Sequence, residues 1–304
     1  MPSRETLFFI YNPQSSRGEK VRDILDLKRA LGGRYPWAET KAPLEAAQIA
    51  ANVARDGVQT IVAVGGDGTV HEIVNGIMSL PKETRPKLGI LPVGSGNDFA
   101  LAAGIRNNLS QALDVVLRGD SMPADIGSLE DDRGQQIFWD NSVGIGFDAK
   151  VSIRSKRFQA LHGLPLYLAS ALLTLLRDHE LLEIDMTIDM RRFSERLLML
   201  TLGNGPREGG GFYTTPNSKI DDGKFEMLLV KPLSRLSMLA LLPKVLRGTH
   251  LTSNAVFERP FSSLRLVSHQ PLAIHADGEI FARPRDGVRG ITVQLHRSAI
   301  RVIV

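Results

Sequence analysis

The apolar and polar positions of this chain follow two different patterns, one before and one after residue 124. In the first part, short apolar runs alternate with stretches whose apolar residues recur at helical spacing. The apolar runs, which predict buried strands, lie at 6–11, 37–40, 60–64 and 88–92. The amphipathic stretches, which predict helices, begin after Gly18 and continue at 43–55, 70–77, 97–102 and 109–117. This alternation predicts an α/β domain with a parallel sheet.

The second part of the chain is dominated by strands. Runs of strand-like composition lie at 124–129, 136–143, 181–190, 195–203, 223–230, 263–267 and 272–275, and the end, 291–304, is again strand-rich. Two stretches between them, 164–177 and 236–247, are apolar on nearly every side and predict helices that are either buried or in contact with lipid. Consecutive strands after an alternating half predict a second domain that is mainly antiparallel.

Two glycine turns follow consecutive strands of the first part. One reads Gly65-Gly66-Asp67-Gly68-Thr69 and the other Gly94-Ser95-Gly96-Asn97-Asp98. Glycine reaches positive φ without steric cost, so both predict tight turns. A turn that leads into a helix presents free backbone N–H groups, which attract phosphate. One such turn is often present for packing alone, but two of them, each with an aspartate, predict binding of nucleotide phosphates and a divalent cation. Neither matches the P-loop or Rossmann pattern.

A third loop of the same kind follows the first strand. It reads Asn12-Pro13-Gln14-Ser15-Ser16 and leads into a helix. The carboxyl ends of parallel strands share one sheet edge, where α/β folds bind ligands, so the three loops are expected to gather there. Ser15 and Ser16 are explained equally well by an ordinary turn, and Thr40 by an N-cap of the helix at 43–55.

Composition narrows the classes of function. A chain of 304 residues favours two domains, and the lack of cysteine excludes disulfides, thiolate chemistry and cysteine zinc sites and fits a cytosolic location. The first residues lead straight into a strand, so we expect no secretory signal.

The net charge of +4 could favour nucleic acid or anionic lipid, but aromatic residues are not interleaved with basic ones, so we expect no nucleic-acid partner. The longest uncharged apolar run, 164–176, is shorter than the ~20 residues of a transmembrane helix.

The two glycine turns together resemble the diacylglycerol kinase catalytic-domain family, which includes sphingosine kinases and bacterial YegS-type lipid kinases. The residues that carry the resemblance are Gly65-Gly66-Asp67-Gly68-Thr69 and Gly94-Ser95-Gly96-Asn97-Asp98-Phe99-Ala100. NAD kinases share the first element but not the second, and the resemblance covers nearly the whole chain. It implies a nucleotide-binding α/β domain at 1–124 plus 285–304. It also implies a mainly antiparallel β-sandwich domain at 125–284 that contributes the lipid-acceptor side of the cleft.

The resemblance implies ATP as the phosphate donor and assigns nucleotide-binding positions on the three loops and on the elements beside them. These positions are Asn12, Pro13, Ser15, Ser16, Thr40, Gly65, Gly66, Asp67, Gly68, Thr69, Glu72, Asn75, Gly94, Ser95, Gly96, Asn97 and Asp98. His71 stands where the family often has asparagine, and we expect a solvated side chain there.

The resemblance also implies a Mg²⁺ ion held by oxygen atoms, which suits a hard cation. Its ligands would be the carboxylate of Asp222 and the backbone carbonyls of Lys219 and Lys224. Asp67 and Asp98 would join this ion through waters, and Asp221 is an alternative ligand. Without the family, Asp222-Gly223 predicts a hairpin turn.

The last element of interest is His275-Ala276-Asp277-Gly278-Glu279. By the resemblance, Glu279 is the general base that takes the proton of the acceptor hydroxyl, and Asp277 orients it or helps with a metal. Asp67 is the other candidate base, in the manner of NAD kinases. Without the family, Asp277-Gly278 predicts a hairpin turn.

These inferences predict an ATP- and magnesium-dependent lipid kinase that phosphorylates a hydroxyl of diacylglycerol, phosphatidylglycerol or a sphingoid base. Such an enzyme would be cytoplasmic and would dock peripherally on the inner membrane face, as a monomer or a homodimer. Arg154, Lys156 and Arg157 could meet anionic headgroups or form an ordinary solvated basic face. The alternatives are an NAD kinase-like enzyme with a soluble acceptor and a non-catalytic nucleotide-binding regulator on the same fold.

Overall fold

The computed structural model describes residues 6–15, 20–156, 158 and 163–304. Two positions singled out above, Ser16 and Arg157, lie outside the described residues. The chain forms two compact units, a first unit of Met1–Ala124 with Ser298–Val304 and a second unit of Asp125–Arg297. The final strand therefore begins in the second unit and ends in the first, whereas the expected return began at residue 285.

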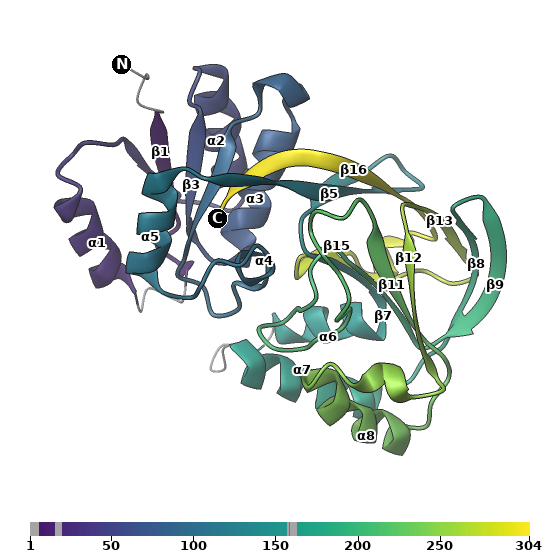
Figure 1. Cartoon of the computed structure of the whole chain (residues 1–304). Helices are drawn as coiled ribbons and strands as arrows, with labels where there is room; N and C mark the ends of the chain where they lie inside the picture. Colours follow the sequence, from purple (N-terminus) through teal and green to yellow (C-terminus); the bar gives the residue numbers. More distant parts are fainter. Residues whose placement is uncertain (1–5, 16–19, 157, 159–162) are drawn as a thin grey trace. The chain divides into compact units, whose positions relative to one another are not determined.

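The first unit is built on a parallel sheet (Figure 1). Its strands are, in sheet order, β2 (Trp37–Glu39), β1 (Leu7–Tyr11), β3 (Thr60–Gly65) and β4 (Lys87–Pro92), followed by the end of β16 (Gly290–Ile303). Thr60 pairs with Leu7 on one side and with Lys87 on the other, and Val302 pairs with Leu88. Every residue of β3 is buried, which accounts for its continuous apolar run. The predicted parallel α/β sheet is confirmed.

Helices connect these strands, as the alternating pattern predicts. They are α1 (Val21–Ala30), α2 (Glu45–Arg55), α3 (Asp67–Met78), α4 (Asp98–Ala102) and α5 (Leu109–Arg118). Helix α3 buries Val70, Ile73 and Ile77, which are among the apolar positions that predicted it. Gly76 lets α3 lie close to α2, because a Cβ atom there would come 2.3 Å from the carbonyl oxygen of Ala47.

The second unit is an antiparallel β-sandwich. One sheet has the order β12 (Val256–Phe261), β11 (Phe225–Val230), β10 (Met199–Gly203), β7 (Ser142–Gly146), β14 (Ile274–Ala276) and β15 (Glu279–Ala282). The other strands are β5 (Ser121–Asp131), β6 (Gln136–Trp139), β8 (Leu182–Ile188), β9 (Arg191–Leu197) and β13 (Ser263–Ser268), which pair with one another and with the start of β16. Trp139, Phe225, Phe261 and Leu264 share one buried core between the sheets. The expected sandwich is confirmed.

Two of the predicted strands are wrong in their extent. The run at 136–143 is divided between β6 and β7, and the run at 195–203 is divided between β9 and β10. In both cases the chain passes directly from one sheet to the other, with no long loop at the crossing that would separate the two strands in the sequence. Strand β12 was not predicted, because its sequence contains Pro260. It lies at the edge of its sheet, where proline is tolerated.

Three helices cover the six-stranded sheet: α6 (Phe147–Ser155), α7 (Gly163–Arg177) and α8 (Arg235–Leu246). The helices expected at 164–177 and 236–247 are therefore present, and α6 was not predicted. Phe147, Ala171 and Met238, one from each helix, share a buried cluster. The outer surface keeps apolar side chains, because Leu176 and Leu236 are 67% and 79% exposed. Core packing thus accounts for only part of the apolar character of α7 and α8.

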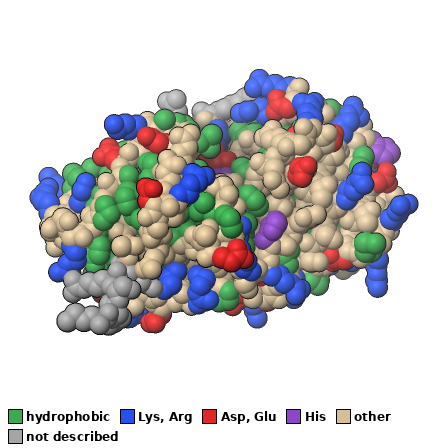
Figure 2. Space-filling model, turned by 90° about the horizontal axis from the view of Figure 1, so that it is seen from above, with side chains coloured by type: hydrophobic (Ala, Val, Ile, Leu, Met, Phe, Trp, Pro, Cys, Tyr) green, Lys and Arg blue, Asp and Glu red, His purple; other side chains and the backbone are tan. Residues whose placement is uncertain are grey.

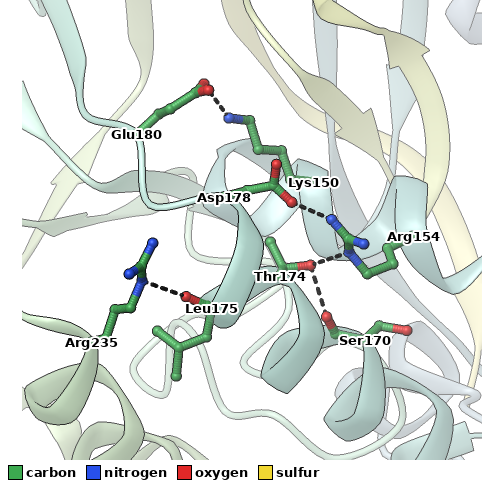
Figure 3. A network of polar contacts seen from close by, with 8 residues as sticks. All are labelled: Lys150, Arg154, Ser170, Thr174, Leu175, Asp178, Glu180 and Arg235. Atoms are coloured by element: carbon green, nitrogen blue, oxygen red, sulfur yellow. Dashed lines mark hydrogen bonds and ion pairs between the residues drawn. The ribbon is translucent and has the colours of Figure 1, made fainter.

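A polar network joins α6 to α7 and α7 to α8 (Figure 3). The guanidinium of Arg154 donates a hydrogen bond to the Thr174 hydroxyl at 2.9 Å and forms an ion pair with Asp178. Arg235 Nε donates to the Leu175 carbonyl at 3.1 Å, at the C-terminal turn of α7. Arg154 is therefore committed to helix packing, and the reading of this residue as a headgroup ligand finds no support.

The surface carries charges of both signs. Figure 2 shows Lys and Arg side chains spread over the face drawn, with Asp and Glu side chains among them. Among the residues that the structure describes, no helix has the length and apolar character needed to cross a membrane.

Candidate functional site

The two glycine turns of the first unit lie directly against each other. A Cβ atom at Gly94 would come 2.4 Å from Cα of Gly66, and one at Gly65 would come 2.3 Å from the hydroxyl of Thr69. None of these three glycines has a positive φ, so the expected reason for glycine here is wrong. The backbones approach so closely that a side chain has no room. The residue with positive φ is Asn97, at 55°.

Asp67 joins the first turn to the second. Its carboxylate accepts hydrogen bonds from the backbone N–H groups of Asn97 at 2.7 Å and Asp98 at 2.6 Å. Burial, and then the neighbouring Asp98 carboxylate, raise the pKa of Asp67 to about 7, although backbone N–H groups of residues 97–99 act in the opposite direction. These N–H groups at the start of α4, which the sequence offered for phosphate, already donate to Asp67.

Asn97 closes the second turn. Its side-chain oxygen accepts the N–H of Gly94 at 3.0 Å, and its amide nitrogen donates to the Gly94 carbonyl at 2.9 Å and to the Asn107 side chain at 3.2 Å. Asn97 is 3% exposed. A short polar side chain tolerates the left-handed conformation, which accounts for asparagine at this position.

Thr69 connects the first glycine turn to the loop after β1. Asn12 donates to its hydroxyl at 3.3 Å, and the Ser15 hydroxyl lies 3.5 Å from it. Asn12 also accepts the N–H of Gln14 at 2.9 Å, which shapes its own loop. The structure therefore brings together the three loops that the sequence placed at one sheet edge. Four further positions that were predicted to bind the nucleotide lie on these loops, namely Pro13, Gly68, Ser95 and Gly96.

Other predicted positions contact the protein itself. Glu72 accepts the N–H of Ala46 at 3.1 Å, in the first turn of α2. Thr40 extends the pairing of β2 with β1, and it is not the N-cap of α2, because that position is Leu44. Asn75 donates to the carbonyl of His71 at 2.9 Å. His71 itself is 3% exposed, so the expectation of a solvated histidine is wrong.

In the second unit, Asp277 and Gly278 form a two-residue turn between β14 and β15. Their φ angles are 50° and 78°, and Ala276 pairs with Glu279 across the hairpin. The hairpin predicted from these two residues is confirmed. The Asp277 carboxylate accepts the backbone N–H groups of Asp140, Asn141 and Ser142, each at 2.9 Å. It therefore fixes the bend between β6 and β7.

Glu279 follows this turn as the first residue of β15. Its side chain is 51% exposed, and its carboxylate accepts a hydrogen bond from the Lys156 ammonium at 2.9 Å. Lys156 lies at the C-terminal end of α6. The sequence contained no signal for this pair, because the two residues are 123 positions apart.

The predicted magnesium loop has the oxygen donors that a hard cation prefers. Asp222 Oδ1 accepts the Lys224 N–H at 3.3 Å, and the Lys224 ammonium lies 3.7 Å from Asp222 Oδ2. Asp125, which the sequence analysis did not single out, accepts the N–H of Gly223 at 2.7 Å and holds the loop. The donor chemistry fits Mg²⁺. The hairpin interpretation of Asp222-Gly223 is wrong, because the residues lie in the long connection between β10 and β11.

Comparison with known proteins identifies the family of the chain. The family model "Diacylglycerol kinase catalytic domain" matches residues 6–129, and "YegS C-terminal NAD kinase beta sandwich-like domain" matches residues 141–304. A protein of Chromohalobacter salexigens named "Probable lipid kinase YegS-like" is 30% identical over 275 residues, which cover 90% of this chain and 86% of that protein. The chain belongs to the diacylglycerol kinase family, with the YegS-like lipid kinases.

Other relatives of this diacylglycerol kinase family member agree in sequence and in fold. The diacylglycerol kinase of Bacillus subtilis is 28% identical over 276 residues, which cover 89% of this chain and 88% of that protein. The crystal structure of a diacylglycerol kinase from Bacillus anthracis superposes with a TM-score of 0.77 at 23% identity, covering 100% of this chain and 98% of that chain. The family resemblance is confirmed, and membership in this kinase family implies ATP as the phosphate donor.

Proposed function

We propose that this protein is a magnesium-dependent lipid kinase in which Glu279 is the general base for transfer of the ATP γ-phosphate to a lipid hydroxyl. The observation that carries this proposal is that the three candidate carboxylates have different hydrogen-bond partners. Asp67 accepts two backbone N–H groups and Asp277 accepts three, whereas Glu279 is half-exposed and contacts the ammonium of Lys156. A general base must reach the proton that it removes, and the half-exposed Glu279 can do so once it separates from Lys156.

The donor side of the proposal rests on the first unit. Helix α3 begins at Asp67 directly after the glycine pair, so its first N–H groups and its dipole favour phosphate. Thr69 and Asn12 add polar side chains from two loops that contact each other. We assign Asp67 to organising this region rather than to proton transfer, because each of its oxygens accepts a backbone hydrogen bond.

The metal is assigned to the loop of the second unit. Asp222, with the carbonyl groups of Lys219 and Lys224, would hold Mg²⁺, and Asp125 keeps the loop in place through Gly223. The bound ion would supply positive charge that the Lys224 ammonium partly supplies here. Removal of one carboxylate therefore gives a direct test of the assignment.

The acceptor is proposed to be a membrane lipid. Relatives named as lipid kinases and diacylglycerol kinases support this class. The exposed leucines at Leu176, Leu236 and Leu239 give α7 and α8 an apolar surface suited to peripheral docking. Diacylglycerol, phosphatidylglycerol and sphingoid bases all carry a hydroxyl that can accept the γ-phosphate, so experiment must decide which of them is the acceptor.

A labelling experiment tests the proposal. The purified protein is incubated with γ-labelled ATP, Mg²⁺ and vesicles that contain diacylglycerol, phosphatidylglycerol and sphingosine, and with NAD in a parallel reaction. We expect label in one lipid and none in NAD. Label in NAD alone would overturn the lipid acceptor and keep the kinase. ATP binding without transfer to any acceptor would contradict catalysis and favour a nucleotide-binding regulator.

A further inference from the structure

A buried side-chain cluster lies behind the Asp277–Gly278 turn. On three neighbouring strands of the six-stranded sheet, Thr201 of β10, Gly144 of β7 and His275 of β14 stand in one row. The middle position has no side chain, and Asp148 from the first turn of α6 fills the gap. Its Oδ2 atom accepts the Thr201 hydroxyl at 2.9 Å and lies 3.5 Å from His275 Nε2.

Glycine at position 144 is required for this arrangement. A Cβ atom there would lie 2.3 Å from Asp148 Oδ2 and 2.3 Å from His275 Nε2. Because the atom would stand between the two partners, even alanine would force them apart. His275 is 2% exposed, and its Nε2 atom makes no hydrogen bond with the described residues but lies 3.5 Å from the Asp148 carboxylate. A buried polar atom is costly unless it is paired, which favours the Asp148 contact.

The other nitrogen of His275 contacts the turn. Gly278 donates its backbone N–H to His275 Nδ1 at 3.3 Å. A nitrogen that accepts a hydrogen bond carries no proton, so the neutral ring has its proton on Nε2, the atom 3.5 Å from Asp148 Oδ2. Asp148, His275 and Gly278 are therefore linked in one chain of polar contacts, with α6 at one end and the turn at the other.

We propose that Asp148 and His275 are positioning residues that hold the Asp277–Gly278 turn and so place Glu279. Glu279 directly follows Gly278, and Asp277 fixes the opposite side of the turn through three backbone N–H groups. The inference rests on the proposed function, because placement of Glu279 matters to turnover only where Glu279 is the base.

A metal site is the alternative use of this cluster. Asp148, Glu208 and His275 place one possible ligand atom each within 4.8 Å of one another. However, Glu208 already accepts the Ser142 hydroxyl at 2.8 Å, and Asp148 accepts that of Thr201. A metal on Nε2 would also require the ring proton to move to Nδ1, where it would face the Gly278 N–H. The contacts therefore favour a pair of facing polar side chains over a metal site.

Substitutions of His275 test the proposal. His275→Leu preserves apolar volume and removes both polar contacts, whereas in His275→Asn the side-chain oxygen can take the place of Nδ1 for Gly278. We expect His275→Leu to lower kcat on the order of 10²-fold with the KM for ATP unchanged, because small misplacements of a reacting group cost this much. His275→Asn should recover part of the loss. His250→Gln, at a buried histidine that contacts the Thr214 carbonyl, is the matched control and should leave kcat unchanged.

A double substitution separates this inference from the proposed function. In a Glu279→Gln background, His275→Leu should cause no further loss of kcat, because residues that act through one group are not additive. Full additivity would overturn the positioning role and leave Glu279 as base. Wild-type turnover in Glu279→Gln alone would overturn the proposed function, and with it the catalytic meaning of the pair.

The geometry is also testable without any variant. Nitrogen NMR of the protein with labelled histidine should show His275 protonated on Nε2 and bare on Nδ1. The opposite tautomer would contradict the chain of contacts. A change of the His275 signals on addition of stoichiometric Zn²⁺ or Mn²⁺ would show that the cluster binds a metal. That result would overturn the positioning role of the pair.

Discussion

Asp67 accepts a hydrogen bond from the backbone N–H of Asp98 at 2.6 Å, so the aspartate of the first glycine turn caps the short helix that follows the second turn. This contact joins two segments that are 31 residues apart in sequence and explains why both turns carry glycine at the point of contact. Partial burial and the neighbouring Asp98 carboxylate raise the pKa of Asp67.

The first prediction concerns the pH dependence of stability. The pKa of Asp67 rises from 3.8 to about 7 on folding, so between these values the folded protein keeps a proton that the unfolded chain has released. The contribution of Asp67 to the free energy of unfolding should therefore fall as pH rises from 4 to 7, by roughly 1–4 kcal/mol, as the difference between the wild type and Asp67→Asn. Asp67→Asn should flatten this profile in urea titrations with EDTA present. The exposed Asp56→Asn is the control, and an equally flat wild-type profile would contradict the prediction.

The second prediction concerns the contact between the two turns. Gly94→Ala should lower the free energy of unfolding by about 1–3 kcal/mol, because its Cβ atom would press on the backbone of Gly66. Affinity for ATP should fall with it. Ser95→Ala, at the exposed neighbouring position, should preserve stability. A stable Gly94→Ala protein with unchanged ATP affinity would show that the turns do not need to touch.

The third prediction concerns the metal. Magnesium should raise the melting temperature of the wild type and of Asp221→Asn, but not of Asp222→Asn, because a ligand that binds the folded state stabilises it. The two aspartates are neighbours, so each variant is the control for the other. A magnesium response lost in Asp221→Asn and kept in Asp222→Asn would move the site by one residue.

The fourth prediction concerns the Asp277 carboxylate. Asp277→Asn keeps a residue that tolerates the φ of 50°, but it removes the charge that accepts three N–H groups. The free energy of unfolding should fall by about 1–3 kcal/mol, as measured in urea. The kcat should fall too, because the turn that directly precedes Glu279 in the chain would be held less firmly. A loss of kcat at unchanged stability would instead indicate that Asp277 contacts the reacting groups.

The sequence predicted the elements whose pattern is local. Strand β3 and helix α3 follow from an apolar run and a helical period, and the β14–β15 hairpin follows from Asp277-Gly278. The glycine turns were placed correctly, but their glycines serve close backbone approach rather than positive φ. Sequence cannot separate these two reasons, because both require the absence of a side chain.

The partners of the candidate residues could not be predicted, because they meet only in the folded chain. Asp125 and Gly223 are 98 residues apart, and Lys156 and Glu279 are 123 apart. The contact between His275 and Asp148 depends on the register of β7 with β14 and on a helix that the apolar period did not reveal. Pairs of this kind carry no periodic signal in a single sequence.

The most direct test of the account is the turnover of Glu279→Gln. We expect kcat for the labelled lipid to fall by ~10²–10⁴-fold while the Kd for ATP is unchanged, because a general base contributes about this much and the nucleotide loops lie in the other unit. Glu183→Gln, at an exposed position of β8, should behave as the wild type. Turnover within a few-fold of wild type in Glu279→Gln, together with its loss in Asp67→Asn at unchanged ATP affinity, would contradict the account and assign the base to Asp67.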